Sequence, residues 1–361
     1  MSKRFVLRFF ATLGSIGLYL VPFLAGAILV FWWFNSNLLS PVAPGSDEVV
    51  LYEVKEGEDL PTISEGLQAR ELLRNAWSVV FLSKLRSDSG EKLSFVAGEY
   101  SLSPGQTPNE ILDTLLSGKT VQHALELGEC LTVRDVARVI GQANLVSESE
   151  AFEALRDQHT LARLGIPAYL PEGYLFAGSY SFSKPIRGEQ VVAKIVTEGQ
   201  KRLDDQLPGW KARAGEIKFR PYEVLILASL LEKEGATEAE RKIISSLYHN
   251  RLRVGMPLQS EAALRYSLPA DQQFVTNEDI NSQGPYNLYL NTGLPPTPVC
   301  SPSFGSIRAA LYPDDTDYLY MVRRDDGTLD YSETIKEHQE KLDAYNAGGP
   351  SADAQRIELL P

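Results

Sequence analysis

The chain has 361 residues, of which 43% are hydrophobic and 23% are charged, and it is long enough for two or three compact units. Its formal net charge of −12 argues against a nucleic-acid-binding protein, because contact with phosphates needs a basic face. Four histidines, two cysteines and no CxxC or HExxH motif lead us to expect no metal and no organic cofactor. Cys130 and Cys300 could pair in an oxidising compartment, but their spacing does not decide this.

An uncharged, strongly apolar run extends over residues 9–34, which is long enough to cross a bilayer as one helix. Residues 1–8 carry three basic side chains, whereas the first charge after the run is at Asp47. The positive-inside rule therefore predicts a cytoplasmic N-terminus over 1–8, a transmembrane helix over 9–34 and the remainder outside. A cleaved signal peptide is the alternative, but its apolar core would be shorter than this run.

Residues 35–48 contain proline and glycine and are expected to form a linker. Residues 49–119 predict a small α/β module, in which Thr107 and Glu110 have the spacing of a capping box and Gly118 ends the helix. The module contains YEVKEGEDLPTIS, which resembles the opening of a LysM module, a small fold that binds glycans containing N-acetylglucosamine. An ordinary strand–helix unit has the same pattern.

The rest of the chain is expected to form an intermediate subdomain over 120–204, a mixed α+β domain over 205–345 and a loosely ordered tail over 346–361. The intermediate subdomain contains LPEGYLFAGSYSF, in which turns and aromatic residues alternate. These aromatic side chains fit either core packing or a wall that stacks against sugars. The expected fold class is therefore membrane-anchored α+β, with the LysM-like α/β module ahead of the larger domain.

The most informative stretch begins with an almost continuously apolar segment at 224–231, which is too short for a membrane span and suits a buried helix. This segment runs directly into Glu232 and Glu234. A second helix is expected to open at Thr237, which has capping-box spacing, and to close at Gly255. The sequence thus predicts a helical hairpin with carboxylates at the exit of its buried arm.

A carboxyl group at such an exit could carry chemistry. Burial disfavours the ionised form, so the group could donate a proton near neutral pH, as cleavage of a glycosidic bond requires. Helices also commonly end in charged residues that face water. Glu232 and Glu234 both have apolar neighbours on helical faces, so the pattern alone does not choose between them.

The chain resembles the YceG-like family of endolytic murein transglycosylases in three stretches, LASLLEKEGATEAERKIISSLYHNRLRVGMPLQSEAALRYSL, GPYNLYLNTGLPPTPVCSP and YLYMVRRDDGTLDYS. The resemblance extends to the order of the parts, from the membrane anchor to the C-terminal catalytic region. It implies that Glu232, the first glutamate of EKE, is the catalytic acid/base, with Glu234 as the runner-up. It also implies that four polar side chains line or brace the glycan cleft, namely Gln259, Glu261, Tyr286 and Asn287.

The chain departs from the family pattern at four places. Glu261 stands where the family usually has aspartate, and Ser301-Pro302-Ser303 stands where it has NPG. Asp330 replaces a histidine, and Ala177-Gly178-Ser179 lies within the segment that the family writes as EGYLFPDTY. These departures leave Glu232 in place and bear on substrate preference and rate.

The resemblance implies non-hydrolytic cleavage of the β-1,4 bond between N-acetylmuramic acid and N-acetylglucosamine in nascent strands, with a role in ending their elongation. Glu232 would protonate the departing oxygen and then take the proton of the muramyl C6 hydroxyl, which closes a 1,6-anhydro ring. Because this hydroxyl is the nucleophile, the second carboxylate of most glycoside hydrolases is not needed. The implied location is the bacterial inner membrane, with a periplasmic catalytic domain. Peptidoglycan strands and cell-wall synthases or division proteins are the implied partners.

Two alternatives stay open. The first is a muramidase-type hydrolase, in which Glu234, Glu261 or another acidic residue completes a pair of carboxylates. The second is a membrane-anchored scaffold that binds peptidoglycan with weak or no activity, its departures from the family pattern marking the loss. Anhydro ends, reducing ends or intact strands after digestion would separate the transglycosylase from these two.

Overall fold

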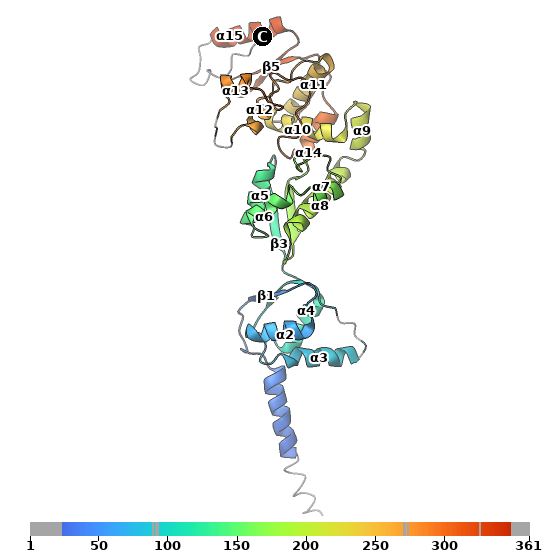
Figure 1. Ribbon diagram of the computed structural model, residues 1–361, viewed down its shortest axis with the longest axis vertical. Helices are drawn as coiled ribbons and strands as arrows, with labels where there is room; N and C mark the ends of the chain where they lie inside the picture. Colours follow the sequence, from blue (N-terminus) through green and yellow to red (C-terminus); the bar gives the residue numbers. More distant parts are fainter. Residues whose placement is uncertain are drawn as a thin grey trace, which may run out of the picture. The chain divides into compact units, whose positions relative to one another are not determined.

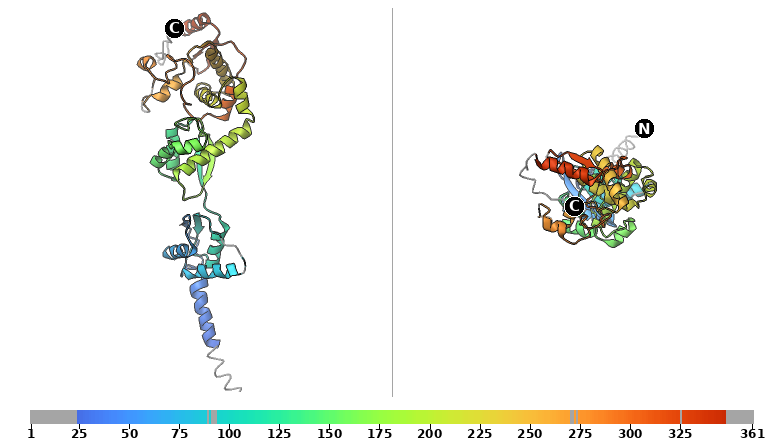
Figure 2. Two further views of the ribbon diagram at one scale, coloured as in Figure 1. Left: turned by 45° about the vertical axis from the view of Figure 1, so that its right-hand side comes forward. Right: turned by 90° about the horizontal axis from the view of Figure 1, so that it is seen from above.

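The computed structural model describes most of the chain as two compact units. The first unit ends at His123 and also takes in Ser183–Pro185, and the second comprises Ala124–Phe182 and the residues from Ile186 onward. Figure 1 and Figure 2 show their helices and strands. The described residues are 24–347, with gaps at 89, 91–93, 270–271, 273 and 325.

The membrane-spanning helix expected over 9–34 lies largely outside the described residues. Its last part, residues 24–34, is helical and continues into a π-helical turn, η1 (Asn35–Leu39). Within the described ranges, no helix is both long and apolar enough to cross a bilayer. The expected N-terminus over 1–8 and the tail beyond residue 347 also lie outside the described residues.

The first unit is built on an antiparallel pair of strands, β1 (Val50–Val54) and β2 (Gly98–Leu102). Two helices lie between the strands in sequence, α2 (Leu60–Ala69) and α3 (Trp77–Asp88), and α4 (Pro108–Ser117) follows β2. Alternate strand residues enter a core with the inner faces of the helices, as the period of two along a strand requires.

The helix expected from the capping-box spacing is confirmed as α4. The Thr107 side chain accepts from the Glu110 backbone N–H, the Glu110 carboxylate accepts from the Thr107 N–H, and Gly118 ends the helix in the left-handed conformation. The segment expected as a linker lies against this unit, because Arg74 donates to the carbonyls of Pro41 and Val42 at 2.8 and 2.9 Å.

The second unit holds most of the helices and two small sheets. The strands β3 (His123–Leu127) and β4 (Gly178–Phe182) pair, and β5 (Tyr320–Arg323) pairs antiparallel with β6 (Leu329–Ser332). The helices are α5 (Val133–Gln142), α6 (Glu148–Ala154), α7 (Gln158–Arg163), α8 (Gly188–Gln206), α9 (Trp210–Glu216), α10 (Pro221–Glu234), α11 (Glu238–Val254), α12 (Glu261–Ser267), α13 (Asn277–Asn281), α14 (Phe304–Leu311) and α15 (Ile335–Ala347). The mixed α+β class is as expected.

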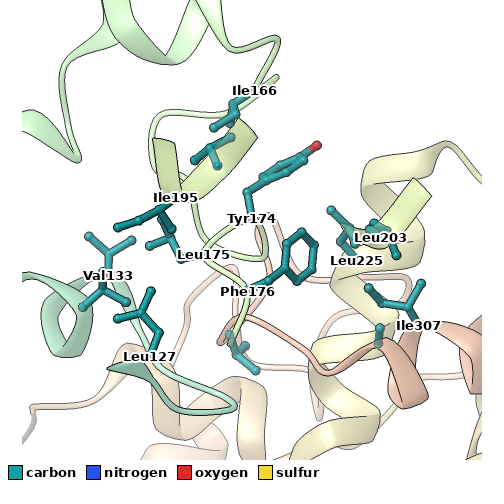
Figure 3. Close-up of a cluster of buried hydrophobic side chains, with 14 of the residues drawn as sticks. Leu127, Val133, Ile166, Tyr174, Leu175, Phe176, Ile195, Leu203, Leu225 and Ile307 are labelled. Atoms are coloured by element: carbon teal, nitrogen blue, oxygen red, sulfur yellow. The ribbon is translucent and has the colours of Figure 1, made fainter. Parts of the chain in front are cut away.

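One hydrophobic core joins the elements of the second unit. Figure 3 shows side chains from the whole length of this unit meeting there, among them Leu127, Leu175, Ile195, Leu225 and Ile307. Each large aliphatic side chain buried in this way stabilises the fold by about 1.5–3 kcal/mol. Most of the unit's length therefore contributes to the core that positions α10.

The expected helical hairpin is confirmed as α10 and α11. The apolar segment at 224–231 is buried along its whole length, and α10 packs against both α11 and α14. Thr237 and Glu240 form the capping box that opens α11, and Gly255 closes it with a φ of 70°. The hairpin therefore follows from local chemistry and from the burial of its first arm.

Candidate active site

Glu232 lies in the last turn of α10, and its side chain is only 5% exposed. Its Oε2 accepts two hydrogen bonds from Ser303, one from the backbone N–H at 2.8 Å and one from the hydroxyl at 2.6 Å. The guanidinium of Arg241, from α11, lies 3.2 Å from Oε1. A buried carboxylate needs such partners, and these three donors fix its orientation.

Ser303 connects this carboxylate to the start of α14. Its hydroxyl oxygen accepts from the backbone N–H of Ser306 at 3.3 Å while its own proton goes to Glu232. The side chain therefore caps α14 and holds Glu232 at the same time. Because a helix N-terminus carries partial positive charge, α14 also favours an anionic group at this position.

The segment that carries Ser303 is docked on α10 at a second point. The hydroxyl of Ser229, one turn before Glu232, accepts from the backbone N–H of Val299 at 3.0 Å. On its other side the segment pairs with the loop before α5. There Cys130 donates its N–H to the carbonyl of Ser301 at 3.1 Å.

A disulfide joins Cys130 to Cys300, with 4.8 Å between the two Cα atoms. The sequence left this pairing open, and the structure contains it. The cross-link connects residues 170 positions apart and lies three residues before Ser303. It therefore holds the partner of Glu232 in place from outside the helical hairpin.

Glu234, the runner-up, has different surroundings. Its Oε1 accepts from the hydroxyl of Ser260 at 2.8 Å, and its backbone carbonyl accepts from Arg323. Burial raises the pKa of Glu234, while the Ser260 hydrogen bond and the charge of Arg323 act in the opposite direction. Among the hydrogen bonds of the described residues, Glu232 and Glu234 share no partner.

The backbone N–H and the side-chain oxygen of Gln259 support the loop before α12. Its φ is 51°, its N–H donates to the Leu288 carbonyl at 2.8 Å, and its Oε1 accepts from Arg251 at 3.0 Å. Arg251 is buried and also donates to the carbonyls of Pro257 and Leu258. The structure thus brings Gln259 together with the segment that contains Asn287.

Asn287 is 1% exposed, and its amide donates to the carbonyls of Ile280 and Ser282 at 2.7 Å each. These contacts brace the turn after α13. Tyr286 forms a hydrogen bond with Thr297 at 2.7 Å. Gln259 and Asn287 thus support backbone, whereas the ring of Tyr286 lies against that of Tyr266, with 5.2 Å between the centroids.

Glu261, the fourth polar residue named from the sequence, is the first residue of α12. Its charge is one of the influences that raise the pKa of Glu234. Asp330, a departure from the family pattern, forms an ion pair with Arg324 at 2.6 Å within the β5–β6 hairpin. The residues 177–179 lead into and begin β4.

Glu172 is a buried carboxyl that the sequence did not single out as a site residue. It is 1% exposed, and it accepts from the Val133 N–H at 2.9 Å and from the Tyr266 hydroxyl at 3.0 Å. Burial raises the pKa of Glu172 to about 7, against the lowering effect of these two hydrogen bonds. The carboxyl therefore connects the start of α5 with α12.

Gly173 follows Glu172 in the EGYLF segment, and the structure shows why this position is a glycine. Its φ is 86°, and a Cβ at this position would lie 2.6 Å from the side chain of Pro298. Only glycine combines this conformation with such a close approach. The apolar neighbours of Glu172 in this segment are the signal from which its burial could have been inferred.

A hollow of about 960 Å³ lies beside the first half of α10. Its lining includes Tyr222, Ile226, His249, Pro295 and Pro296, but not Glu232. Among the residues that the structure describes, no three His, Cys, Asp or Glu side chains group as a metal site would.

The candidate site is thus a buried carboxylate held by a serine and an arginine at the exit of an apolar helix, on an α+β fold. Such a carboxyl group has the chemistry that acid–base catalysis requires. Residues 52–344 match the YceG-like family, and the chain belongs to this family. The endolytic murein transglycosylase of Bacillus subtilis strain 168 is 28% identical to it, over 86% of this chain and 89% of the relative.

Two further proteins are similar over most of the chain. The endolytic murein transglycosylase of Streptococcus pneumoniae serotype 2 is 28% identical over 94% of this chain and 65% of the relative. The crystal structure of a YceG-like protein from Listeria monocytogenes is similar with a TM-score of 0.55 and 27% identity. That alignment covers 82% of this chain and 99% of the Listeria chain.

Proposed function

We propose that the chain is an endolytic lytic transglycosylase of peptidoglycan. Its membership of the YceG-like family and its 28% identity with endolytic murein transglycosylases support this activity. The observation that carries the proposal is the buried carboxylate of Glu232, held at 2.8 and 2.6 Å by Ser303. The bond cleaved is the β-1,4 linkage between N-acetylmuramic acid and N-acetylglucosamine of nascent strands, and cleavage ends their elongation.

The hydrogen bonds of Glu232 indicate different roles for its two carboxylate oxygens in the proposed reaction. Oε2 is occupied by both donors of Ser303, whereas Oε1 has only the Arg241 guanidinium at 3.2 Å. Oε1 is therefore the oxygen that gives its proton to the departing glycosidic oxygen. It then accepts the proton of the muramyl C6 hydroxyl as that oxygen bonds to C1 and closes the 1,6-anhydro ring. Arg241 stabilises the carboxylate between the two steps.

A single acid/base fits the geometry better than a carboxylate pair. Glu232 and Glu234 are two residues apart on one helix, so their side chains leave it in nearly opposite directions. The pair in a hydrolase must face one sugar from a separation of about 5–9.5 Å. The hydrogen bond from Ser260 commits Glu234 to a different neighbourhood, which argues against Glu234 as the second carboxylate of a muramidase.

Digestion of purified glycan strands by the full chain in detergent tests this proposal. Products with 1,6-anhydro ends, lighter by one water than hydrolysis products, are expected by mass spectrometry. The variant Glu232→Gln should bind strands and leave them intact. Reducing ends would show a hydrolase, and intact strands bound by the wild-type chain would show a scaffold. Full activity of Glu232→Gln would refute the role of this residue.

We further propose that residues 9–34 anchor the chain once in the bacterial inner membrane, with residues 1–8 in the cytoplasm and the catalytic domain in the periplasm. The charge asymmetry around the apolar run supports this orientation. The disulfide supports it too, because such bonds persist in oxidising compartments. Protease treatment of spheroplasts should digest the second unit without breaking the inner membrane. Protection of that unit would contradict the orientation.

The proposed role of the first unit is that of a LysM-like module that binds the glycan. The strand–turn–helix opening supports it, since β1 is followed by a turn and by α2, whose N-cap is Asp59. Cell-wall synthases or division proteins are the proposed partners of an enzyme anchored in this membrane. Retention of the chain on insoluble peptidoglycan should weaken when the exposed face of this unit is altered.

A further inference from the structure

The helix α3 in the first unit carries large apolar side chains on its outward face as well as on its inward one. The face packed on the unit holds Val79 and the partly buried Leu82, which contact the core, together with the buried Ser78 and Ser83. The outward face holds Trp77, which is 71% exposed, and Phe81, which is 37% exposed. A surface helix in water places its large apolar side chains inward and its polar ones outward. The exposed Trp77 and Phe81 indicate that the outward face meets an apolar medium.

The outward face of α3 adjoins a second exposed apolar element. The ring of Phe81 contacts the ring of Phe34 edge-on, with 5.5 Å between the centroids. Phe34 ends the helical segment 24–34. The large apolar residues of this segment from Leu24 to Trp33 are each more than half exposed. In both views α3 lies at the end of the first unit from which this segment leaves (Figure 1 and Figure 2).

We propose that α3 lies on the surface of the lipid bilayer, with Trp77 and Phe81 inserted at the boundary between headgroups and acyl chains. This inference rests on the membrane anchoring proposed above. The same bilayer that receives the segment 24–34 then covers the outward face of α3, because the Phe34–Phe81 contact places the two apolar surfaces next to each other. The first unit is thereby docked on the membrane as well as tethered to it.

The composition of the outward face fits this occupant. Tryptophan is enriched at membrane interfaces, where its ring is apolar and its N–H reaches polar groups. Lys84 is exposed on α3 between the positions of Phe81 and Asp88, and a lysine can extend its ammonium to the headgroups while its methylenes stay apolar. Arg86 points elsewhere, since it pairs with Asp113 of α4 at 2.6 Å. The charges of Lys84 and Asp88 offset each other, so the outward face of α3 has no strong net charge. The proposed partner is therefore a lipid bilayer in general rather than an anionic lipid.

Tryptophan fluorescence of the full chain in vesicles tests the proposal, with phospholipids that carry bromine on their acyl chains close to the headgroup as the quencher. The chain has four tryptophans, Trp32, Trp33, Trp77 and Trp210, and Trp210 is buried in the second unit. In a Trp32→Phe/Trp33→Phe background we expect blue-shifted emission that the brominated lipid quenches. Adding Trp77→Phe should remove the quenched component and leave the emission of Trp210.

The outcomes separate the inference from the anchoring on which it rests. Quenching of Trp32 and Trp33 without quenching of Trp77 would leave the anchoring intact and overturn the inference. No quenching of any of the three would overturn both. Blue-shifted Trp77 emission that brominated lipid does not affect would mean that protein covers α3, and it would equally overturn the inference. Cleavage of glycan strands by the same samples reports on the enzyme independently.

Discussion

Glu232 and Ser303 are joined by two hydrogen bonds that end on the same carboxylate oxygen, at 2.8 Å from the backbone N–H and 2.6 Å from the hydroxyl. The family pattern has a glycine where this chain has Ser303, so a chain with that pattern would offer the N–H alone. The hydroxyl is thus an addition to the proposed site that directly contacts the acid/base group.

Replacing Ser303 with alanine should lower kcat by roughly tenfold to a hundredfold, because a hydrogen bond to a charged group is worth about 1.5–3 kcal/mol. The same hydroxyl also caps α14, so its loss should loosen the segment that positions the carboxylate. Ser301→Ala is the matched control, because the Ser301 hydroxyl accepts from the Leu175 N–H and not from Glu232. An unchanged kcat in Ser303→Ala would contradict the role of the hydroxyl.

Glu234→Gln should retain cleavage and still release products with anhydro ends. The amide can keep the hydrogen bond from the Ser260 hydroxyl, so the main effect expected is a change in the free energy of unfolding. Because burial raises the pKa of Glu234, the neutral amide resembles its protonated form. Product analysis by mass spectrometry checks this, with Glu232→Gln as the inactive reference. Loss of activity in Glu234→Gln would restore the carboxylate pair and with it the muramidase alternative.

Removing the disulfide with Cys130→Ser and Cys300→Ser should lower the free energy of unfolding by about 2–5 kcal/mol, the usual cost of losing a native cross-link. Activity should also fall, because Ser303 follows the cross-link by three residues and holds Glu232. Thermal unfolding with and without a reductant provides the measurement. Reductant should lower the Tm of the wild-type chain and leave that of the double variant unchanged. Equal Tm values for both proteins without reductant would count against a stabilising bond.

Glu172 should make the second unit less stable as the pH rises through the acidic range. Its pKa is raised from 4.5 to about 7, so the folded chain binds a proton that the unfolded chain has lost. The stability linked to this proton is full below about pH 4.5 and lost by about pH 7, and it amounts to about 3 kcal/mol. Glu172→Gln keeps acceptors for Val133 and Tyr266 and removes the titration. Urea unfolding at several pH values should show that the free energy of unfolding falls less with rising pH in Glu172→Gln than in the wild-type chain. An equal fall in both proteins would show that Glu172 is not the source of the pH dependence.

The parts of the fold that follow from local chemistry could be predicted from the sequence. The capping box at Thr237 and the stop at Gly255 set the ends of α11, and the apolar run at 224–231 required a buried helix. Each of these depends on residues within a few positions of one another. The class of the fold followed from the same patterns, since helices with one apolar face and short alternating strands are both present.

The contact between Glu232 and Ser303 could not be predicted, because the two residues lie far apart along the chain. Ser303 lies 71 positions away and Cys130 lies 170 positions from its partner. No local periodicity records such contacts, so the disulfide stayed open and Ser303 was noticed only as a departure from the family pattern. Asn287 is a second example. A sequence motif identifies the residue, but it does not show to which carbonyl groups the side-chain amide donates.

The disulfide also closes a covalent ring that contains the whole of α10 and α11. A peptide bond broken anywhere between residues 131 and 299 would leave two fragments that are still bonded to each other through sulfur. The periplasmic location proposed above would expose the chain to proteases, and a nick in an exposed loop of the ring would not release either piece. The helix that carries Glu232 and the segment that carries Ser303 would stay in one molecule after such a cut.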